Sequence, residues 1–219
     1  MTFRSAWLVS ALLLATGFAH STTGYNQDLD APREWNFRVY LGDAEIGHHR
    51  FRLTQEGGTT VLSTEADFKV RFLFFTAYRY QHVNSETWRD DCLQRIDAHT
   101  DANGKIIDVE GEQRRDAFHL EAPDSSRALS GCIKTFAYWN PGILHEDALL
   151  NPQTGEMMPV EVEEVSTETL VIRGQDVPAR RFRLTTEDLS LDIWYSNDSE
   201  WLALESTTKD GRTLRYELI

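Results

Sequence analysis

The feature that most constrains the fold is an alternation of apolar and polar residues along most of the chain. In its first segment the apolar residues are Trp35, Phe37, Val39 and Leu41, with polar or amphipathic residues between them. Turn signals such as Asn103-Gly104 separate this segment from later ones, at a spacing of roughly eight to twelve residues. A period of two places alternate side chains on opposite faces of a strand. The sequence therefore predicts an all-β fold, with a strongly curved antiparallel sheet or an incomplete barrel.

One stretch near the middle of the chain interrupts the alternation. The segment Gly131–Leu144 (GCIKTFAYWNPGIL) combines a cysteine, three aromatic residues and an Asn-Pro-Gly turn. We expect one short helical insertion near 133–150, made of two helical pieces that are broken at Pro141. Structural roles are predicted for Tyr138 and Trp139 in this insertion, and for Trp88 in the strand before it.

The insertion divides a single β-rich domain, residues 35–219, into two predicted meander halves. These halves cover residues 35–130 and 156–219, and we call the segment 131–155 that joins them the plug. The motif Arg-Phe-Arg-Leu-Thr occurs at 50–54 and again at 181–185. This recurrence favours two related halves, although alternating arginine and apolar residues are also common in unrelated strands.

The N-terminus has the pattern of a cleaved signal peptide. Arg4 precedes an apolar run, and small residues occur near Ala19, where we place the end of the signal peptide 1–19. The run is shorter than the roughly 20 residues that cross a bilayer, and no lipoprotein cysteine follows it. Residues 20–34 show no periodicity and are predicted to form a flexible lead-in. We therefore expect an exported protein, in the periplasm, without a transmembrane segment in the mature chain.

The charge of the mature chain restricts its partners. Without residues 1–19 it has 21 Lys and Arg against 35 Asp and Glu, a formal net charge of −14. So acidic a chain repels the phosphate backbone, which argues against nucleic acid as a partner. The sequence does not indicate an oligomeric state.

Cys92 and Cys132 are the only cysteines. In an exported chain the simplest role of a single pair is a disulfide, and we predict one between them. The alternative is a nucleophilic Cys132 beside a histidine, which would have to remain reduced in an oxidising compartment.

The strand around residues 78–88 has an unusual face. Tyr78, Tyr80, His82 and Glu86 alternate on this face and are the predicted ligand-binding residues. The alternative is an exposed face that carries tyrosines. His82 and Glu86 lie four residues apart on an extended chain, about 13 Å, so they cannot share one metal ion without a bend. We predict no metal site and no cofactor.

Several motifs resemble a known family. They are WNFRVYLGDAEIGHHRF, YRYQH, GCIKTFAYWNP, LLNPQTGE and IWYSNDSEWLALES, and together they span nearly all of the mature chain. The chain resembles an uncharacterised family of exported bacterial proteins with a domain of unknown function. It is more distantly similar to a broader family of periplasmic β-rich proteins. The resemblance implies export and a β fold, and it implies no activity.

Three functions remain open at this point. The first is binding of a small apolar or amphipathic molecule in a barrel-like cavity. The second is a hydrolase-like enzyme that uses His82, Glu86 or His145 as a base, although the sequence contains no Gly-x-Ser-x-Gly motif. The third is a structural envelope protein without a ligand.

Overall fold

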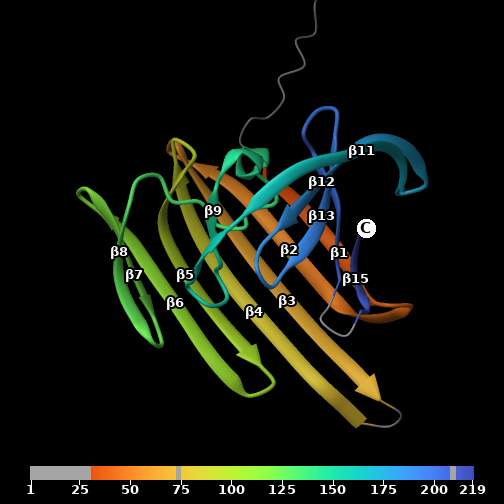
Figure 1. Cartoon of the computed structure of the whole chain (residues 1–219), viewed down its shortest axis with the longest axis horizontal. Helices are drawn as coiled ribbons and strands as arrows, with labels where there is room; N and C mark the ends of the chain where they lie inside the picture. Colours follow the sequence, from red (N-terminus) through yellow and green to blue (C-terminus); the bar gives the residue numbers. More distant parts are fainter. Residues whose placement is uncertain (1–30, 73–74, 208–210) are drawn as a thin grey trace, which may run out of the picture.

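The computed structural model describes residues 31–72, 75–207 and 211–219, and nearly all of its regular structure is β-strand (Figure 1). The predicted signal peptide and residues 20–30 of the predicted lead-in lie outside the described residues. The first strand begins at Arg33, within the last residues of the predicted lead-in.

The described part of the chain contains fifteen strands and one 3-10 helix. The strands before the plug are β1 (Arg33–Leu41), β2 (Ala44–Glu56), β3 (Thr59–Phe72), β4 (Phe75–Arg89), β5 (Cys92–Ala102), β6 (Lys105–Arg114), β7 (Ala117–Ala122) and β8 (Ser125–Ser130). The helix η1 (Pro141–His145) and β9 (Ala148–Leu150) belong to the plug, and β10 (Met157–Pro159) follows it. The last strands are β11 (Glu161–Ile172), β12 (Gln175–Thr185), β13 (Ser190–Ser196), β14 (Trp201–Thr207) and β15 (Thr213–Leu218). Over these residues, no helix has the length and apolar character needed to span a membrane.

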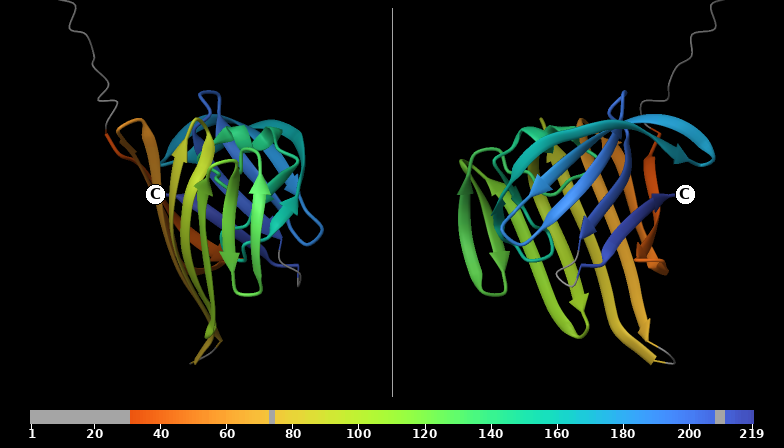
Figure 2. Two further views of the ribbon diagram at one scale, coloured as in Figure 1. Left: turned by 90° about the vertical axis from the view of Figure 1, so that its left-hand side faces the viewer. Right: turned by 45° about the vertical axis from the view of Figure 1, so that its right-hand side comes forward.

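Thirteen strands form one sheet, which runs from β11 through β15 to β1 and then through to β8. The two meanders join where β1 pairs antiparallel with β15, with Phe37 opposite Leu218. Strands β8 and β11 are therefore the two edges, and no pairing joins them within the described ranges. The sheet curls strongly without closing (Figure 2). This arrangement confirms the predicted all-β, incomplete barrel.

The alternation predicted from the sequence buries the inner face of the curled sheet. On β1, Trp35, Phe37 and Val39 are 1%, 0% and 0% exposed. The ring of Phe37 lies 4.4 Å from that of Trp201 on β14 and 6.1 Å from that of Phe51 on β2. Aromatic contacts therefore connect the two meanders in one hydrophobic core, as their shared cluster of buried residues shows.

The plug covers this inner face, but it is less helical than predicted. Its only helix is the single 3-10 turn η1, and the predicted helical piece Ile133–Trp139 is irregular. The reason is that this backbone pairs with β9 instead. Leu150 donates its N–H to the carbonyl of Lys134, and its own carbonyl accepts from the N–H of Phe136. Thr135 consequently forms a parallel bridge with Leu150.

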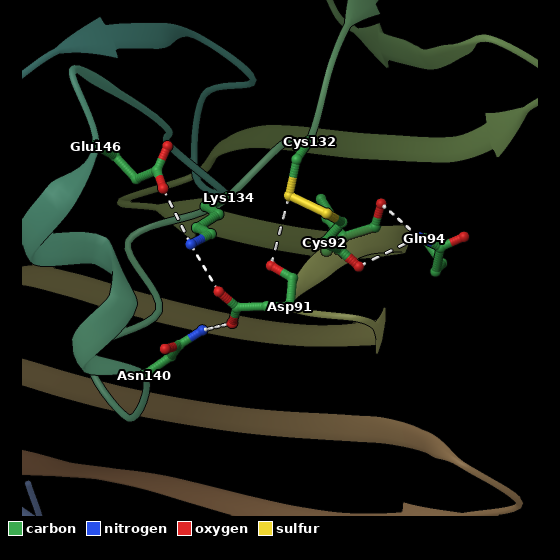
Figure 3. The surroundings of a disulfide bond; sticks show 8 residues. Asp91, Cys92, Gln94, Cys132, Lys134, Asn140 and Glu146 are labelled. Atoms are coloured by element: carbon green, nitrogen blue, oxygen red, sulfur yellow. Dashed lines mark hydrogen bonds and ion pairs between the residues drawn. A yellow bond between two sulfur atoms is a disulfide. The ribbon is translucent and has the colours of Figure 1, made fainter.

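A cluster of covalent and ionic contacts attaches the start of the plug to the β4–β5 turn (Figure 3). The predicted disulfide between Cys92 and Cys132 is present. Beside it, Lys134 Nζ lies 2.7 Å from a carboxylate oxygen of Asp91 and 2.9 Å from one of Glu146. Asn140 donates from its side-chain amide to the other carboxylate oxygen of Asp91. The plug is thus held at one place by several different groups.

Aromatic residues hold the middle of the plug on both sides. Trp139 packs edge-to-face on Trp88 of β4, with ring centroids 5.7 Å apart. Tyr138 lies 5.4 Å from Trp201, and its carbonyl accepts a 2.8 Å hydrogen bond from the hydroxyl of Tyr195 on β13. The plug therefore bridges the first meander and the second.

The repeated Arg-Phe-Arg-Leu-Thr motif lies on β2 and on β12. A tryptophan follows each copy of the motif in the sequence. The first, Trp88, lies two strands later, on β4, whereas the second, Trp194, lies only one strand later, on β13. In antiparallel meanders this difference reverses the strand direction, so the two tryptophans do not occupy equivalent places.

The disulfide leads to a stability prediction. It closes a loop between residues 40 apart, for which the chain-entropy model gives about 4 kcal/mol of stabilisation. A double variant, Cys92→Ser with Cys132→Ser, is expected to unfold in urea with a free energy lower by roughly that amount. Reductant should destabilise the parent chain similarly and leave the variant unchanged. Equal stability of variant and parent would contradict the prediction.

Candidate ligand-binding site

A cavity of about 350 Å³ lies between the inner face of the sheet and the plug. Its sheet wall consists of His49, Phe51, Leu62, Thr64, His82, Asn84, Glu86, Leu191, Leu204, Ser206, Leu214 and Tyr216, with Leu189 just before β13. The remaining wall consists of Phe136, Ala137, Tyr138, Trp139, Asn151, Pro152 and Gln153 of the plug, with Met158 of β10. Among these lining residues there is no lysine or arginine. The cavity is therefore mainly apolar and aromatic, with a few polar side chains.

Strand β4 contributes three of the polar side chains, more than any other strand. His82, Asn84 and Glu86 are 3%, 3% and 1% exposed, and all three line the cavity. Tyr80 lies next along the same face, where it stacks on Phe68 at 5.4 Å, and it is not among the lining residues. Two of the four predicted ligand-binding residues, His82 and Glu86, therefore belong to the cavity wall.

Tyr78 lies outside the cavity. Its side chain is 40% exposed, although it continues the alternation of β4. The ends of β3 and β4 extend beyond the neighbouring strands, where the plug no longer covers the sheet (Figures 1 and 2). The alternation alone could not indicate where this cover ends, and Tyr78 does not belong to the cavity wall.

Glu86 is a buried carboxyl group surrounded by hydrogen-bond donors. Its Oε1 accepts from Asn84 Nδ2 at 2.9 Å. Its Oε2 accepts from Trp88 Nε1 at 2.9 Å and from the Thr135 hydroxyl at 3.2 Å. Burial raises the pKa of Glu86, while these three donors act in the opposite direction. Through Thr135, the carboxyl group also connects β4 to the plug.

The two histidines of the wall are neutral at physiological pH. Burial lowers the pKa of His49 to about 3 and that of His82 to about 4. His82 Nδ1 is hydrogen-bonded to the Thr100 hydroxyl at 2.9 Å, and His49 Nδ1 lies 3.4 Å from the Tyr216 hydroxyl. Neither imidazole supplies a positive charge to the cavity.

Three buried polar atoms in the wall have no hydrogen-bond partner in the protein. They are His49 Nε2, Asn84 Oδ1 and Trp139 Nε1. Asn84 lies on the strand face identified from the sequence, but it was not among the predicted site residues. His49 was also missed, and its only signal was its place in the alternation with Phe51. Buried polar groups in proteins are nearly always paired, so these atoms mark the polar part of the site.

Of the three residues considered as a catalytic base, only His82 and Glu86 lie at the cavity. His145 is exposed in η1 and does not line the cavity, while His82 and Glu86 are bonded to Thr100 and to three donors. Nor does the structure, over its described ranges, contain a group of three or more potential metal ligands. The geometry gives no support to the hydrolase alternative.

A barrel-like fold is also found in a solved structure. The crystal structure of a beta-barrel-like protein of domain of unknown function DUF1849 from Brucella abortus matches with a TM-score of 0.64 and 6% identity, covering 87% of this chain and 96% of that one. At this identity the match shows the fold alone. The chain belongs to the family described as a domain of unknown function (DUF6134), whose model matches residues 37–219. No curated protein matches the sequence.

The raised pKa of Glu86 predicts a pH dependence of stability. Because the folded state holds this proton more tightly than the unfolded state, the contribution of Glu86 to stability falls as pH rises above its ordinary pKa of 4.5. Glu86→Gln removes this titration. We expect the unfolding free energy of the parent minus that of the variant, measured by urea titration at several pH values, to be largest at acidic pH and to decline toward neutrality. A difference that grows with pH would contradict the assignment.

Proposed function

We propose that the chain is an exported protein that binds a small apolar or amphipathic molecule in the cavity between the sheet and the plug. The observation that carries the proposal is the mainly apolar cavity with three unpartnered polar atoms in its wall. Leaving a buried donor or acceptor unsatisfied costs about 1–3 kcal/mol. A ligand that pairs with such atoms and buries its apolar part would offset this cost.

The size and charge of the cavity narrow the range of ligands. Its volume of about 350 Å³ lies near the lower end of the roughly 300–1,000 Å³ of small-molecule sites. Its described lining has no cationic side chain and includes the buried Glu86. Transfer of an unpaired charge into such a site is unfavourable, so an uncharged ligand is favoured. Among the lining residues Gln153 is exposed and Pro152 is half-buried, so the lining reaches the protein surface at this turn of the plug.

Export is supported by two features that arise independently. One is the signal-like pattern of residues 1–19. The other is the Cys92–Cys132 disulfide, which suits an oxidising compartment such as the periplasm. A ligand from the cell envelope would be available there.

Ligand binding can be tested with N-phenyl-1-naphthylamine, an uncharged apolar fluorophore. The mature chain should enhance its fluorescence saturably, with one site per chain. Thr64→Phe fills the cavity from β3 and should reduce the affinity at least tenfold. Ser63→Phe adds the same ring to the exposed face of the same strand and should bind like the parent. Absence of saturable binding, or binding unaffected by Thr64→Phe, would favour a structural protein without a ligand.

Export can be tested by N-terminal sequencing of the chain recovered from the periplasm of a bacterial host. We expect the mature chain to begin near His20 or Thr22. Protein that keeps Met1 and stays with the inner membrane would contradict the proposal.

A further inference from the structure

We infer that the cavity selects an uncharged ligand whose polar end both donates and accepts a hydrogen bond, as an alcohol does. We further infer that Glu86 sets this preference by fixing the orientation of the Asn84 amide. Both inferences rest on the binding function proposed above and add the class of ligand.

The orientation of Asn84 follows from the donors around Glu86. An indole N–H can only donate, so Trp88 Nε1 requires Glu86 Oε2 to be an acceptor. Thr135 occupies the same oxygen. The other oxygen, Oε1, faces the Asn84 amide at 2.9 Å. Asn84 Nδ2 donates to this oxygen, and the ionised form of Glu86 requires that orientation, because the Asn84 oxygen would place two acceptors against each other.

This orientation leaves the amide oxygen of Asn84 for the ligand. Asn84 is 3% exposed, and its Oδ1 is buried without a partner in the cavity wall. An atom of this kind accepts a hydrogen bond and cannot donate one. The ligand must therefore supply a donor at the β4 side of the cavity.

Trp139 of the plug has an unpaired donor, where Asn84 has an unpaired acceptor. Its Nε1 is a buried donor without a partner, and the residue lines the same cavity. A hydroxyl group both donates and accepts, so it can serve an acceptor such as Asn84 Oδ1 and a donor such as Trp139 Nε1. A ketone lacks the donor, an ammonium group lacks the acceptor, and a carboxylate lacks the donor and brings a negative charge near Glu86.

The rest of the lining accommodates an apolar body. Leu191, Leu204 and Leu214 contribute the wall on β13, β14 and β15, on the far side of the sheet order from β4. Phe51 lies between these two sides on β2, and it is opposite Thr64 in the sheet register. The cavity therefore has a polar side on β4 and a leucine-rich side on the second meander, which also contributes Ser206 and Tyr216. This polarity suits an amphipathic alcohol.

The test compares ligands that share a ten-carbon body. The compounds 1-decanol, 2-decanone, decanoate and decylamine would displace N-phenyl-1-naphthylamine from the mature chain at pH 8. Decanol is expected to displace the probe at about one tenth of the concentration needed for 2-decanone, because the ketone leaves Asn84 Oδ1 unpaired. Decanoate and decylammonium should be weaker still.

Glu86→Gln tests the positioning role separately. Trp88 and Thr135 hold the new amide oxygen at the Oε2 position, so the new NH2 group faces Asn84 and reverses its amide. The advantage of decanol over 2-decanone should then fall to within about twofold. Glu65→Gln makes the same change on the exposed face of β3 and should keep the parent's preference. If Glu86→Gln does not fold, Asn84→Leu removes the acceptor directly and should also abolish the preference.

The outcomes separate this inference from the binding proposal. If the probe binds but decanol and 2-decanone displace it equally from the parent, the ligand class is wrong and binding stands. A preference for decanol that persists in both Glu86→Gln and Asn84→Leu would overturn the role of the two side chains. If the probe does not bind saturably, the binding function fails and this inference fails with it.

Discussion

The attachment of the plug to the β4–β5 turn is the constraint on which the rest of the structure depends. The sheet is curled, but its edges β8 and β11 do not pair, so it does not close on itself. Another segment must therefore cover the apolar inner face. The plug provides that cover, and its position is set where Cys132 is bonded to Cys92. Three residues further on, Thr135 reaches Glu86. Because these contacts lie close together in the chain, they fix the plug against β4 and so define the cavity.

The lysine in this attachment is unusually buried for a charged residue. Lys134 is 8% exposed and lies between the carboxylates of Asp91 and Glu146. Burial lowers the pKa of Lys134, but the two acidic partners outweigh it and the pKa is raised. A buried ammonium group without such partners would be strongly destabilising. The buried ammonium group of the plug is therefore stabilised by two carboxylates, Asp91 on the turn and Glu146 after η1.

Sequence reasoning succeeded where the determining signal was local. The period of two predicted the strands and the inward position of His82 and Glu86. The even cysteine count predicted the disulfide. It could not give the pairing of β1 with β15, because contacts between the two ends of the chain leave no local pattern. The irregular backbone of Ile133–Trp139 depends on Leu150, which was itself predicted to end the second helical piece and instead lies in the strand β9. His49 lines the cavity because the curl of the sheet brings β2 opposite the plug, which the local sequence pattern does not indicate.

The cavity itself argues for a ligand on energetic grounds. Protein interiors are normally filled to the density of organic crystals, and a void loses the dispersion contacts of its walls. This chain keeps the small residues Thr64 and Ala137 in the lining, where larger apolar side chains would fill the space. It also leaves Asn84 and Trp139 with unpaired polar atoms in the wall. Both features are unfavourable for the free protein, and under the proposed function a bound molecule that fills the space and pairs with these atoms would compensate for both at once.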